Sequence, residues 1–123
     1  MKKYFLDTNF LYALFAKDAL SDAAYAIFED IADSELITSV IVVAELYSSN
    51  QNMHFFQALE DLNIKVIDLT LTDILAMTQI LNKETRNSLK SNDSIILTQA
   101  QITDAKLITF DKKLSKYYKL ISK

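Results

Sequence analysis

The chain of 123 residues contains no glycine and no proline, and this absence limits the turns that it can form. Glycine is the usual residue wherever the backbone needs a positive φ angle, so tight turns here must depend on asparagine, aspartate and serine. We therefore expect turns at residues 50–52, Asn63, Asn87 and Asn92. The absence of glycine also excludes glycine-rich phosphate loops, so the chain has neither a Walker loop nor a dinucleotide fingerprint.

The composition is that of an ordinary folded domain. Hydrophobic residues make up 50% of the chain and charged residues 24%, and 123 residues are enough for one core. We therefore expect a single domain over residues 1–123. No apolar run approaches the roughly 20 residues of a membrane-spanning helix, and Asp7 interrupts the apolar start too early for a signal peptide. We expect a cytoplasmic protein with no membrane partner. The absence of cysteine excludes disulfides, thiol nucleophiles and thiolate zinc sites.

The charge is distributed unevenly, although the net charge is only −3. From residue 83 to the end there are nine Lys or Arg residues and four acids, whereas residues 1–82 hold four Lys and twelve acids. The two segments therefore carry charges of +5 and −8. Such an asymmetry is consistent with a nucleic-acid-binding face, and it is equally consistent with lysines that only solvate the C-terminal segment.

Short apolar runs alternate with segments of helical periodicity along the whole chain. The apolar runs predict strands at residues 4–6, 36–37, 65–67, 106–109 and 119–121. The periodicity predicts helices at residues 8–17, 21–33, 40–49 (after Ser39 as N-cap), 55–62, 72–84 and 92–102, and a short helical turn at 112–116. This alternation is typical of α/β folds, and we expect a three-layer sandwich with a short, mainly parallel central sheet flanked by helices.

Four acidic residues stand in apolar surroundings. Asp7 and Asp111 each follow an apolar strand, Glu45 interrupts the apolar helix of residues 40–47, and Asp93 opens the helix of residues 92–102. A carboxylate near a core is unfavourable unless it is paired, hydrogen-bonded or bound to a metal. Few cationic residues stand beside these four acids, so we interpret them as ligands of a divalent metal. Oxygen ligands suit Mg²⁺ or Mn²⁺.

The expected topology brings the four acids to one edge of the sheet. In open parallel sheets, ligands bind beyond the carboxyl ends of the strands, where Asp7 and Asp111 belong. The helices that carry Glu45 and Asp93 begin at the same edge. Each acid also has a plain structural explanation, since Asp7 and Asp111 can cap helices and Asp93 can be an ordinary first-turn acid. Glu45 is the hardest to explain in that way, because its helix is apolar on nearly every side.

The remaining polar residues offer weaker candidates for a site. Asp68 follows the predicted strand of residues 65–67 and therefore competes with the four acids for a role at the strand ends. His54 is the only histidine, so it has no histidine partner for a metal site. The Ser and Thr residues show no histidine-based triad, so we do not expect serine-type nucleophilic catalysis.

The segments around the four acids resemble the four motifs of PIN domains, in the order in which that family has them. Residues 6–9 (LDTN) resemble the first motif, 39–46 (SVIVVAEL) the second, 92–96 (NDSII) with Ala100 the third, and 107–114 (LITFDKKL) the fourth. The resemblance spans essentially the whole chain, and its compact length is most similar to VapC-like toxins of bacterial type II toxin–antitoxin systems. The chain departs from the family in lacking loop Gly and Pro, and in having Ser94 where Ala is common.

The resemblance implies a metal-dependent endoribonuclease that hydrolyses RNA phosphodiester bonds. Its catalytic and metal-binding residues would be Asp7, Glu45, Asp93 and Asp111, with one or two Mg²⁺ or Mn²⁺ ions. Thr8, Asn9 and Thr109 would support these ligands through hydrogen bonds. Arg86, Lys90, Lys112 and Lys113 would hold RNA phosphates.

The resemblance also implies two protein partners, a cognate antitoxin and a second copy of the chain in a homodimer. The interface candidates are Tyr12, Leu14, Phe15 and the helix that contains Phe55 and Phe56, although core packing explains these side chains as well.

Two alternatives stay open at this stage. A non-catalytic module of the same fold would bind RNA or protein without cutting it. A receiver or haloacid-dehalogenase-like phosphatase domain would also use a strand-end Asp with Mg²⁺. The phosphatase needs a second Asp two residues after the first, where this chain has Asn9. The receiver could use Asp68, but it leaves Glu45 unexplained.

Overall fold

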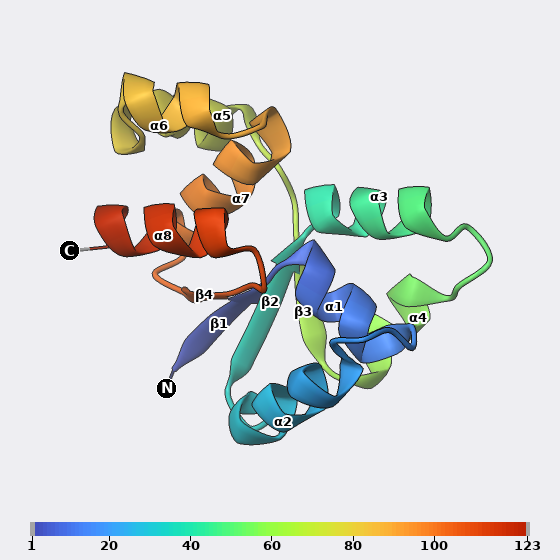
Figure 1. Ribbon diagram of the computed structural model, residues 1–123. Helices are drawn as coiled ribbons and strands as arrows, with labels where there is room; N and C mark the ends of the chain where they lie inside the picture. Colours follow the sequence, from blue (N-terminus) through green and yellow to red (C-terminus); the bar gives the residue numbers. More distant parts are fainter. Residues whose placement is uncertain (1, 123) are drawn as a thin grey trace.

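The structure, a computed structural model, describes residues 2–122 and consists of a parallel sheet flanked by helices (Figure 1). The strands are β1 (Lys3–Leu6), β2 (Glu35–Ser39), β3 (Ile64–Ile67) and β4 (Lys106–Ile108). The helices are α1 (Thr8–Phe15), α2 (Ser21–Ile31), α3 (Val40–Ser49), α4 (Phe55–Asp61), α5 (Leu71–Ile80), α6 (Lys83–Ser88), α7 (Ser91–Ile102) and α8 (Lys112–Ile121). All strand pairs are parallel, so the predicted α/β class and central sheet are confirmed.

The strand order β3-β2-β1-β4 determines where a ligand site can form. The chain steps from β1 to β2 to β3 in one direction and then returns to place β4 on the other side of β1. With right-handed crossovers, α1–α4 cover one face and α5–α7 the other. The contacts agree, because α1 meets α2 and α3, whereas α7 meets α5, α6 and α8 (Figure 1). The reversal of direction leaves a crevice between the carboxyl ends of β1 and β4.

The core lies between the sheet and the inner faces of these helices. Its largest fully buried side chains include Phe5 of β1, Phe10 of α1 and Phe55 of α4. Phe55 packs edge-on against Tyr47, with ring centroids 5.4 Å apart. Among the interface candidates, Leu14 and Phe55 are buried in the core, Tyr12 and Phe15 are packed against it, and Phe56 is 49% exposed.

Asparagine and aspartate take the place of glycine in some turns, whereas two of the predicted turns do not exist. Asn63 adopts a φ of 57° between α4 and β3, as expected, and Asn50 closes the turn of residues 50–52 by accepting from the Asn52 amide. The predicted turns at Asn87 and Asn92 are wrong, because these residues lie inside α6 and α7. Asp104, which the sequence did not single out, has a φ of 53° after α7.

The helix predicted over residues 72–84 is two helices, α5 and α6. The break occurs at Leu81, whose side chain is fully buried, and at Asn82, whose Oδ1 accepts from the Thr85 amide at 2.8 Å as the N-cap of α6. Helical periodicity continues across this break, so the side chains alone did not reveal it. Of the helices within residues 2–122, none is both long and apolar enough to traverse a lipid bilayer.

The strand predicted at residues 119–121 is wrong, because α8 continues to Ile121. Leu114, Tyr117, Tyr118 and Ile121 recur at helical spacing and pack against the core. A three-residue strand would leave most of these side chains in solvent, whereas the helix buries them along one face. The helix therefore carries the C-terminal lysines on its other face.

Candidate functional site

The four predicted carboxylates line one pocket of about 330 Å³ at the carboxyl edge of the sheet. They reach it from four elements, since Asp7 follows β1, Glu45 lies on α3, Asp93 opens α7 and Asp111 precedes α8. We call this the acidic pocket; its lining residues are Asp7, Thr8, Asn9, Tyr12, Asp18, Leu20, Glu45, Ser49, Asp93 and Asp111. The reversal between β1 and β4 brings Asp7 and Asp111 to the same pocket.

Asp7 is held from two sides. Its amide extends the pairing of β1 with β4 by donating to the Ile108 carbonyl at 3.0 Å. Its Oδ1 accepts from the Thr8 amide at 2.8 Å and caps α1, while its Oδ2 accepts from the Thr109 hydroxyl at 2.7 Å. Asp7 is therefore both a helix cap and a wall of the acidic pocket, and the two interpretations of this residue do not exclude each other.

The loop between β4 and α8 is fastened to α1 through two polar side chains. The amide of Phe110 donates to Asn9 Oδ1 at 3.0 Å, and the amide of Asp111 donates to Thr109 Oγ1 at 3.0 Å. Asp111 Oδ1 then accepts from the amides of Lys113 and Leu114 at the start of α8. These bonds engage Oδ1 and leave Oδ2 of Asp111, a residue that lines the acidic pocket, without a donor among residues 2–122.

Glu45 points from α3 toward α1. Its helix neighbours Val42 and Leu46 are fully buried, and Glu45 itself is half-buried. The Thr8 hydroxyl donates to Glu45 Oε1 at 2.6 Å, a short bond of the charge-assisted kind. Within residues 2–122, Oε2 has no hydrogen-bond donor and can face a ligand.

Asp93 occupies the first turn of α7, where the helix dipole favours a negative charge. It is half-buried, and no donor within residues 2–122 hydrogen-bonds its carboxylate. Lys90 and Lys113 are close enough to lower its pKa, although burial and nearby acids raise the pKa more strongly.

The carboxylates of the acidic pocket repel one another. Burial raises the pKa of Asp7 from 3.8 to about 6; the Thr109 and Thr8 bonds oppose this rise, and the charges of Asp93 and Glu45 add to it. Burial also raises the pKa of Asp93, and Asp111 and Glu45 raise it further. The charged form of each of these two carboxylates is therefore disfavoured by two other acids of the same pocket. A bound cation would offset this repulsion.

The donor chemistry of this pocket fits a hard divalent cation, because its strong donors are carboxylates. Their arrangement is looser than a coordination shell, since no three acidic or histidine side chains within residues 2–122 are placed to hold one ion together. Three of the four instead accept hydrogen bonds from threonine hydroxyls or helix amides. Holding an ion would require these side chains to turn inward.

Three predicted supporting residues and several unpredicted ones lie at the pocket. Thr8 and Asn9 line it, and Thr109 reaches it through its bond to Asp7. Asp18 also lines the pocket from the α1–α2 connection, where its Oδ1 accepts from the Leu20 amide at 2.8 Å. No pattern in the sequence distinguished Asp18 from the solvated acids that follow it.

Two weaker candidates lie elsewhere. Asp68 is exposed outside the acidic pocket, and its carbonyl accepts from Gln99 Nε2 at 3.2 Å. His54 is exposed directly before α4. Neither side chain contributes to the four-carboxylate arrangement.

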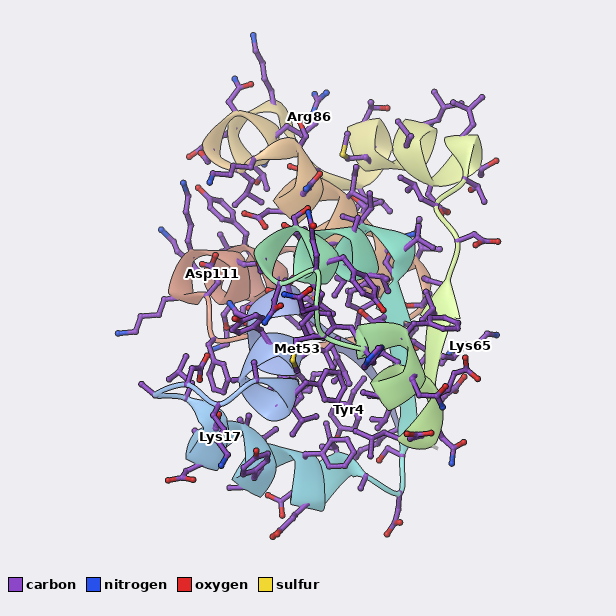
Figure 2. All side chains as sticks on the ribbon, turned by 90° about the vertical axis from the view of Figure 1, so that its right-hand side faces the viewer. Tyr4, Lys17, Met53, Lys65, Arg86 and Asp111 are labelled. Atoms are coloured by element: carbon purple, nitrogen blue, oxygen red, sulfur yellow. The ribbon has the colours of Figure 1, made fainter. Side chains whose placement is uncertain are left out.

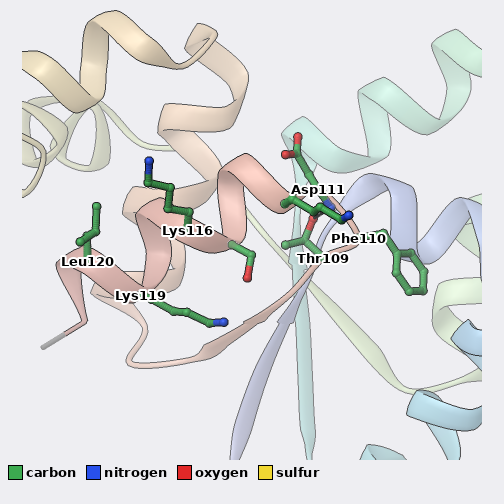
Figure 3. A pocket seen from close by; sticks show the side chains of 8 residues that line it. Thr109, Phe110, Asp111, Lys116, Lys119 and Leu120 are labelled. Atoms are coloured by element: carbon green, nitrogen blue, oxygen red, sulfur yellow. Dashed lines mark hydrogen bonds between the residues drawn. The ribbon is translucent and has the colours of Figure 1, made fainter.

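The four basic residues expected to bind RNA do not line a common cavity. Lys90 and Lys113 lie near Asp93, and their charges lower its pKa. Lys112 lines a second cavity, the lysine hollow (Figure 3). Arg86 lies on α6, well apart from Asp111 (Figure 2), and lines neither cavity. The lysine hollow has a volume of about 760 Å³ and is lined by Thr109, Phe110, Asp111, Lys112, Ser115, Lys116, Lys119 and Leu120.

Comparison with known proteins relates the whole fold to one family. The family model of the PIN domain matches residues 4–120. No curated protein matches the chain in sequence.

Two solved structures are similar in fold. A chain in the crystal structure of VapBC2 from Rickettsia felis, bound to a DNA fragment from their promoter, is 24% identical with a TM-score of 0.67, over 93% of this chain and 92% of that chain. VapC20 of Mycobacterium tuberculosis, described as a Sarcin-Ricin loop cleaving toxin, is 18% identical with a TM-score of 0.70, over 93% of this chain and 94% of that chain. At such identities the likeness concerns the fold.

Proposed function

The chain belongs to the PIN domain family, and we propose that it is a metal-dependent endoribonuclease that hydrolyses RNA phosphodiester bonds. One observation carries this proposal above all others. Carboxylates from four separate segments, Asp7, Glu45, Asp93 and Asp111, line one pocket at the carboxyl edge of the sheet. A receiver or phosphatase domain needs no glutamate on α3, whereas a nuclease of this kind uses all four acids.

The roles of the side chains follow from their surroundings. When bound, one or two Mg²⁺ or Mn²⁺ ions would supply positive charge that offsets the carboxylates and the RNA phosphate and acidifies a water. Asp7 and Asp93, whose pKa values are raised in the free protein, are the most direct ligands. Glu45 uses Oε2 as a ligand or to orient the attacking water, while Thr8 holds its other oxygen. Asp111 completes the set through Oδ2.

We further propose that the protein is the toxin of a toxin–antitoxin pair and acts on RNA in the cytoplasm. The likeness to the chain in the VapBC2 structure and to VapC20 supports this role. The antitoxin would cover the acidic pocket and neutralise it with a basic side chain. A homodimer is the assembly that we expect for the family.

A cleavage assay tests the enzymatic proposal. We expect the wild type to cut a mixed-sequence RNA in Mg²⁺ or Mn²⁺ and to lose this activity in chelator. Asp93→Asn should reduce the rate by at least about a hundredfold, because it removes one ligand charge. The matched control is Asp68→Asn, which makes the same change at an aspartate that follows β3 outside the pocket and should leave the rate unchanged.

Three results would contradict the enzymatic proposal. Cleavage that persists in chelator would exclude metal dependence, and equal rates for Asp93→Asn and the wild type would exclude the acidic pocket as the site. RNA binding without cleavage under any metal would favour the non-catalytic module. The toxin role has a separate test, because expression of the wild type should arrest growth and expression of Asp93→Asn should not.

A further inference from the structure

The extension of α8 to Ile121 places three lysines on one face of that helix. Lys112, Lys116 and Lys119 stand at positions i, i+4 and i+7, so their side chains project within about 60° of one another around the helix axis. All three are exposed, and all three line the lysine hollow. Lys113 lies about 100° away around the axis and acts instead on Asp93.

The lysine hollow adjoins the acidic pocket. Asp111 lines both cavities, and Thr109 lines the hollow while bonding Asp7 in the pocket. Figure 3 shows Asp111 at one end of the hollow and Leu120 at the other, with Lys116 and Lys119 between them. Seven steps of the helix separate Lys112 from Lys119, or about 10 Å along the axis. A basic cleft therefore leads away from the acidic pocket along α8.

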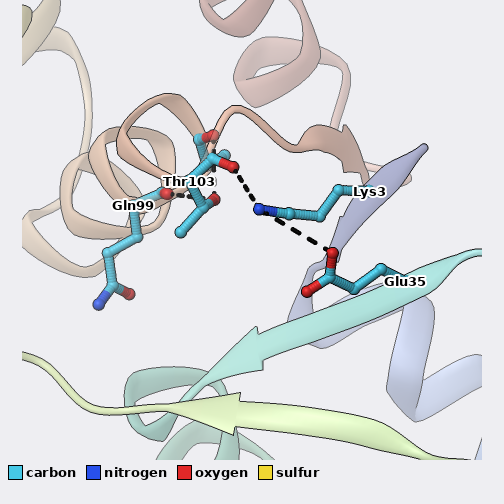
Figure 4. Close-up of polar contacts among 5 residues, drawn as sticks. Lys3, Glu35, Gln99 and Thr103 are labelled. Carbon is cyan, nitrogen blue, oxygen red and sulfur yellow. Dashed lines mark hydrogen bonds and ion pairs between the residues drawn. The ribbon is translucent and has the colours of Figure 1, made fainter. Parts of the chain in front are cut away.

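The three lysines carry charges that the protein does not neutralise. Within residues 2–122 none of them forms an ion pair with an acidic side chain, and Lys116 only approaches the ring of Tyr117, 5.7 Å from its centroid. Lys3, at the opposite edge of the sheet, is different. Its ammonium donates to the Thr103 carbonyl at 3.1 Å and lies 4.0 Å from Glu35 (Figure 4). The α8 lysines are thus available to an external anion.

The hollow also offers surfaces for more than phosphate. The half-exposed Leu120 supplies apolar surface, and Ser115 and Thr109 supply hydroxyl groups, whereas the ring of Phe110 packs against Phe10. Proteins hold single-stranded nucleic acid by this combination of a basic groove for the backbone and apolar or aromatic side chains for unstacked bases. An acidic peptide would use the lysines but would have no need of a groove that begins at the acidic pocket.

From these observations we infer that the lysine hollow binds the single-stranded RNA segment next to the scissile phosphate. This inference rests on the proposed nuclease function. Lys112, Lys116 and Lys119 contact successive backbone phosphates of the strand, which runs from the acidic pocket along α8. The hollow is therefore a substrate-binding subsite whose three lysines take no part in the chemical step.

Binding of a short labelled polyuridine strand tests the inference. Fluorescence anisotropy would be measured over a series of salt concentrations in chelator, so that no strand is cut. The variant Lys112→Gln/Lys116→Gln/Lys119→Gln should bind about tenfold more weakly at low salt. Its log–log salt slope should fall by about 2, because each lost phosphate contact removes about 0.7 for a single strand.

The control Lys2→Gln/Lys65→Gln/Lys106→Gln removes the same charge from exposed lysines that do not line the lysine hollow. Two of these, Lys2 and Lys106, line a different hollow, which also contains Tyr118 and Asp104. The control should keep the wild-type affinity within about twofold and the wild-type slope. Equal weakening of both variants would show that only the overall charge of the protein matters. Wild-type binding by the α8 variant would exclude the subsite. Either result overturns the inference.

A cleavage measurement separates this inference from the function on which it rests. In Mg²⁺ or Mn²⁺, the α8 variant should raise KM and keep kcat within about threefold, because it loses binding that is equal in the ground and transition states. A loss of kcat at unchanged KM would overturn the subsite. If the wild type cuts no RNA but the α8 variant still loses strand binding, the nuclease proposal fails and the binding surface stands.

Discussion

The Thr109 hydroxyl donates a 2.7 Å hydrogen bond to Oδ2 of Asp7, although 102 positions of the sequence separate the two residues. The pairing of Leu6 with Ile108 in neighbouring strands puts them side by side. The same Thr109 oxygen accepts from the amide of Asp111 at 3.0 Å. One hydroxyl thus joins two acids of the pocket, and it does so at the point where the strand order reverses.

We expect Thr109→Val to weaken both the fold and the proposed activity. Valine keeps the shape of threonine but removes the donor to Asp7 and the acceptor for the Asp111 amide. Losing a hydrogen bond to a charged group costs about 1.5–3 kcal/mol, and the pKa of Asp7 should rise further. Thermal unfolding and RNA cleavage would measure the two effects. Thr109→Ser retains the hydroxyl and is the matched control; equal behaviour of the two variants would show that the bond has no role.

The stability of the metal-free protein should fall as the pH rises through the range in which Asp7 ionises. Because the folded-state pKa of Asp7 is raised from 3.8 to about 6, its contribution is fully present below about pH 3.8 and is lost as the pH passes about 6. The raised pKa of Asp93 acts in the same direction. Since each tenfold change in proton affinity corresponds to about 1.4 kcal/mol, Asp7 alone accounts for roughly 3 kcal/mol.

Asp7→Asn isolates this effect, because asparagine does not titrate. Its free energy of unfolding in chelator, relative to the wild type, should increase by roughly 2.5 kcal/mol between about pH 4 and pH 7. Urea unfolding at each pH gives this difference directly. A difference that does not change with pH would contradict the raised pKa of Asp7.

Divalent metal should reverse that loss of stability at neutral pH. An ion that binds only the folded protein adds about 2.7 kcal/mol at a hundredfold excess over its Kd, which raises the Tm by about 10 °C for a chain of this size. Mn²⁺ should therefore raise the Tm of the wild type and of Asp68→Asn, but raise that of Asp93→Asn much less. Identical melting of the wild type in Mn²⁺ and in chelator would remove the metal-site hypothesis.

The position of the acids could be predicted from the sequence because it follows from strand ends and helix starts. Asp7 and Asp111 follow apolar runs, and in a parallel sheet such runs end at one edge. The register that pairs Leu6 with Ile108 has no such local signature, so the bond between Asp7 and Thr109 became evident only in three dimensions. The proximity of Asp18 to the pocket depends in the same way on tertiary packing.

The strand predicted at residues 119–121 is wrong because a short apolar segment has no clear preference between strand and helix. The apolar pair Leu120 and Ile121 resembles a strand, but the spacing of Leu114, Tyr117 and Ile121 favours a helix that buries one face. Without this helix, Lys119 would not share a face with Lys112, so the lysine hollow could not be predicted either. Long-range packing selected the helix over the local preference for a strand.

Asp104 provides a test of how the chain manages without glycine. It has a φ of 53° at the end of α7, where its amide donates to the Gln101 carbonyl and the Ala105 amide donates to the Ala100 carbonyl. These two bonds form a Schellman motif, in which the left-handed residue is usually glycine. Aspartate is doubly unfavourable at this position, because its Cβ strains the left-handed backbone and its charge faces the negative end of the helix dipole.

We therefore expect Asp104→Gly to raise the free energy of unfolding by up to about 1 kcal/mol, despite the greater freedom of glycine in the unfolded chain. Asp104→Asn should give a smaller gain, since it removes only the charge, and Asp104→Ala should be less stable than Asp104→Gly by about 1 kcal/mol. Urea unfolding would rank the three variants, and RNA cleavage should be unchanged because Asp104 lies outside the acidic pocket. An alanine variant as stable as the glycine variant would show that the left-handed backbone imposes no strain at this position.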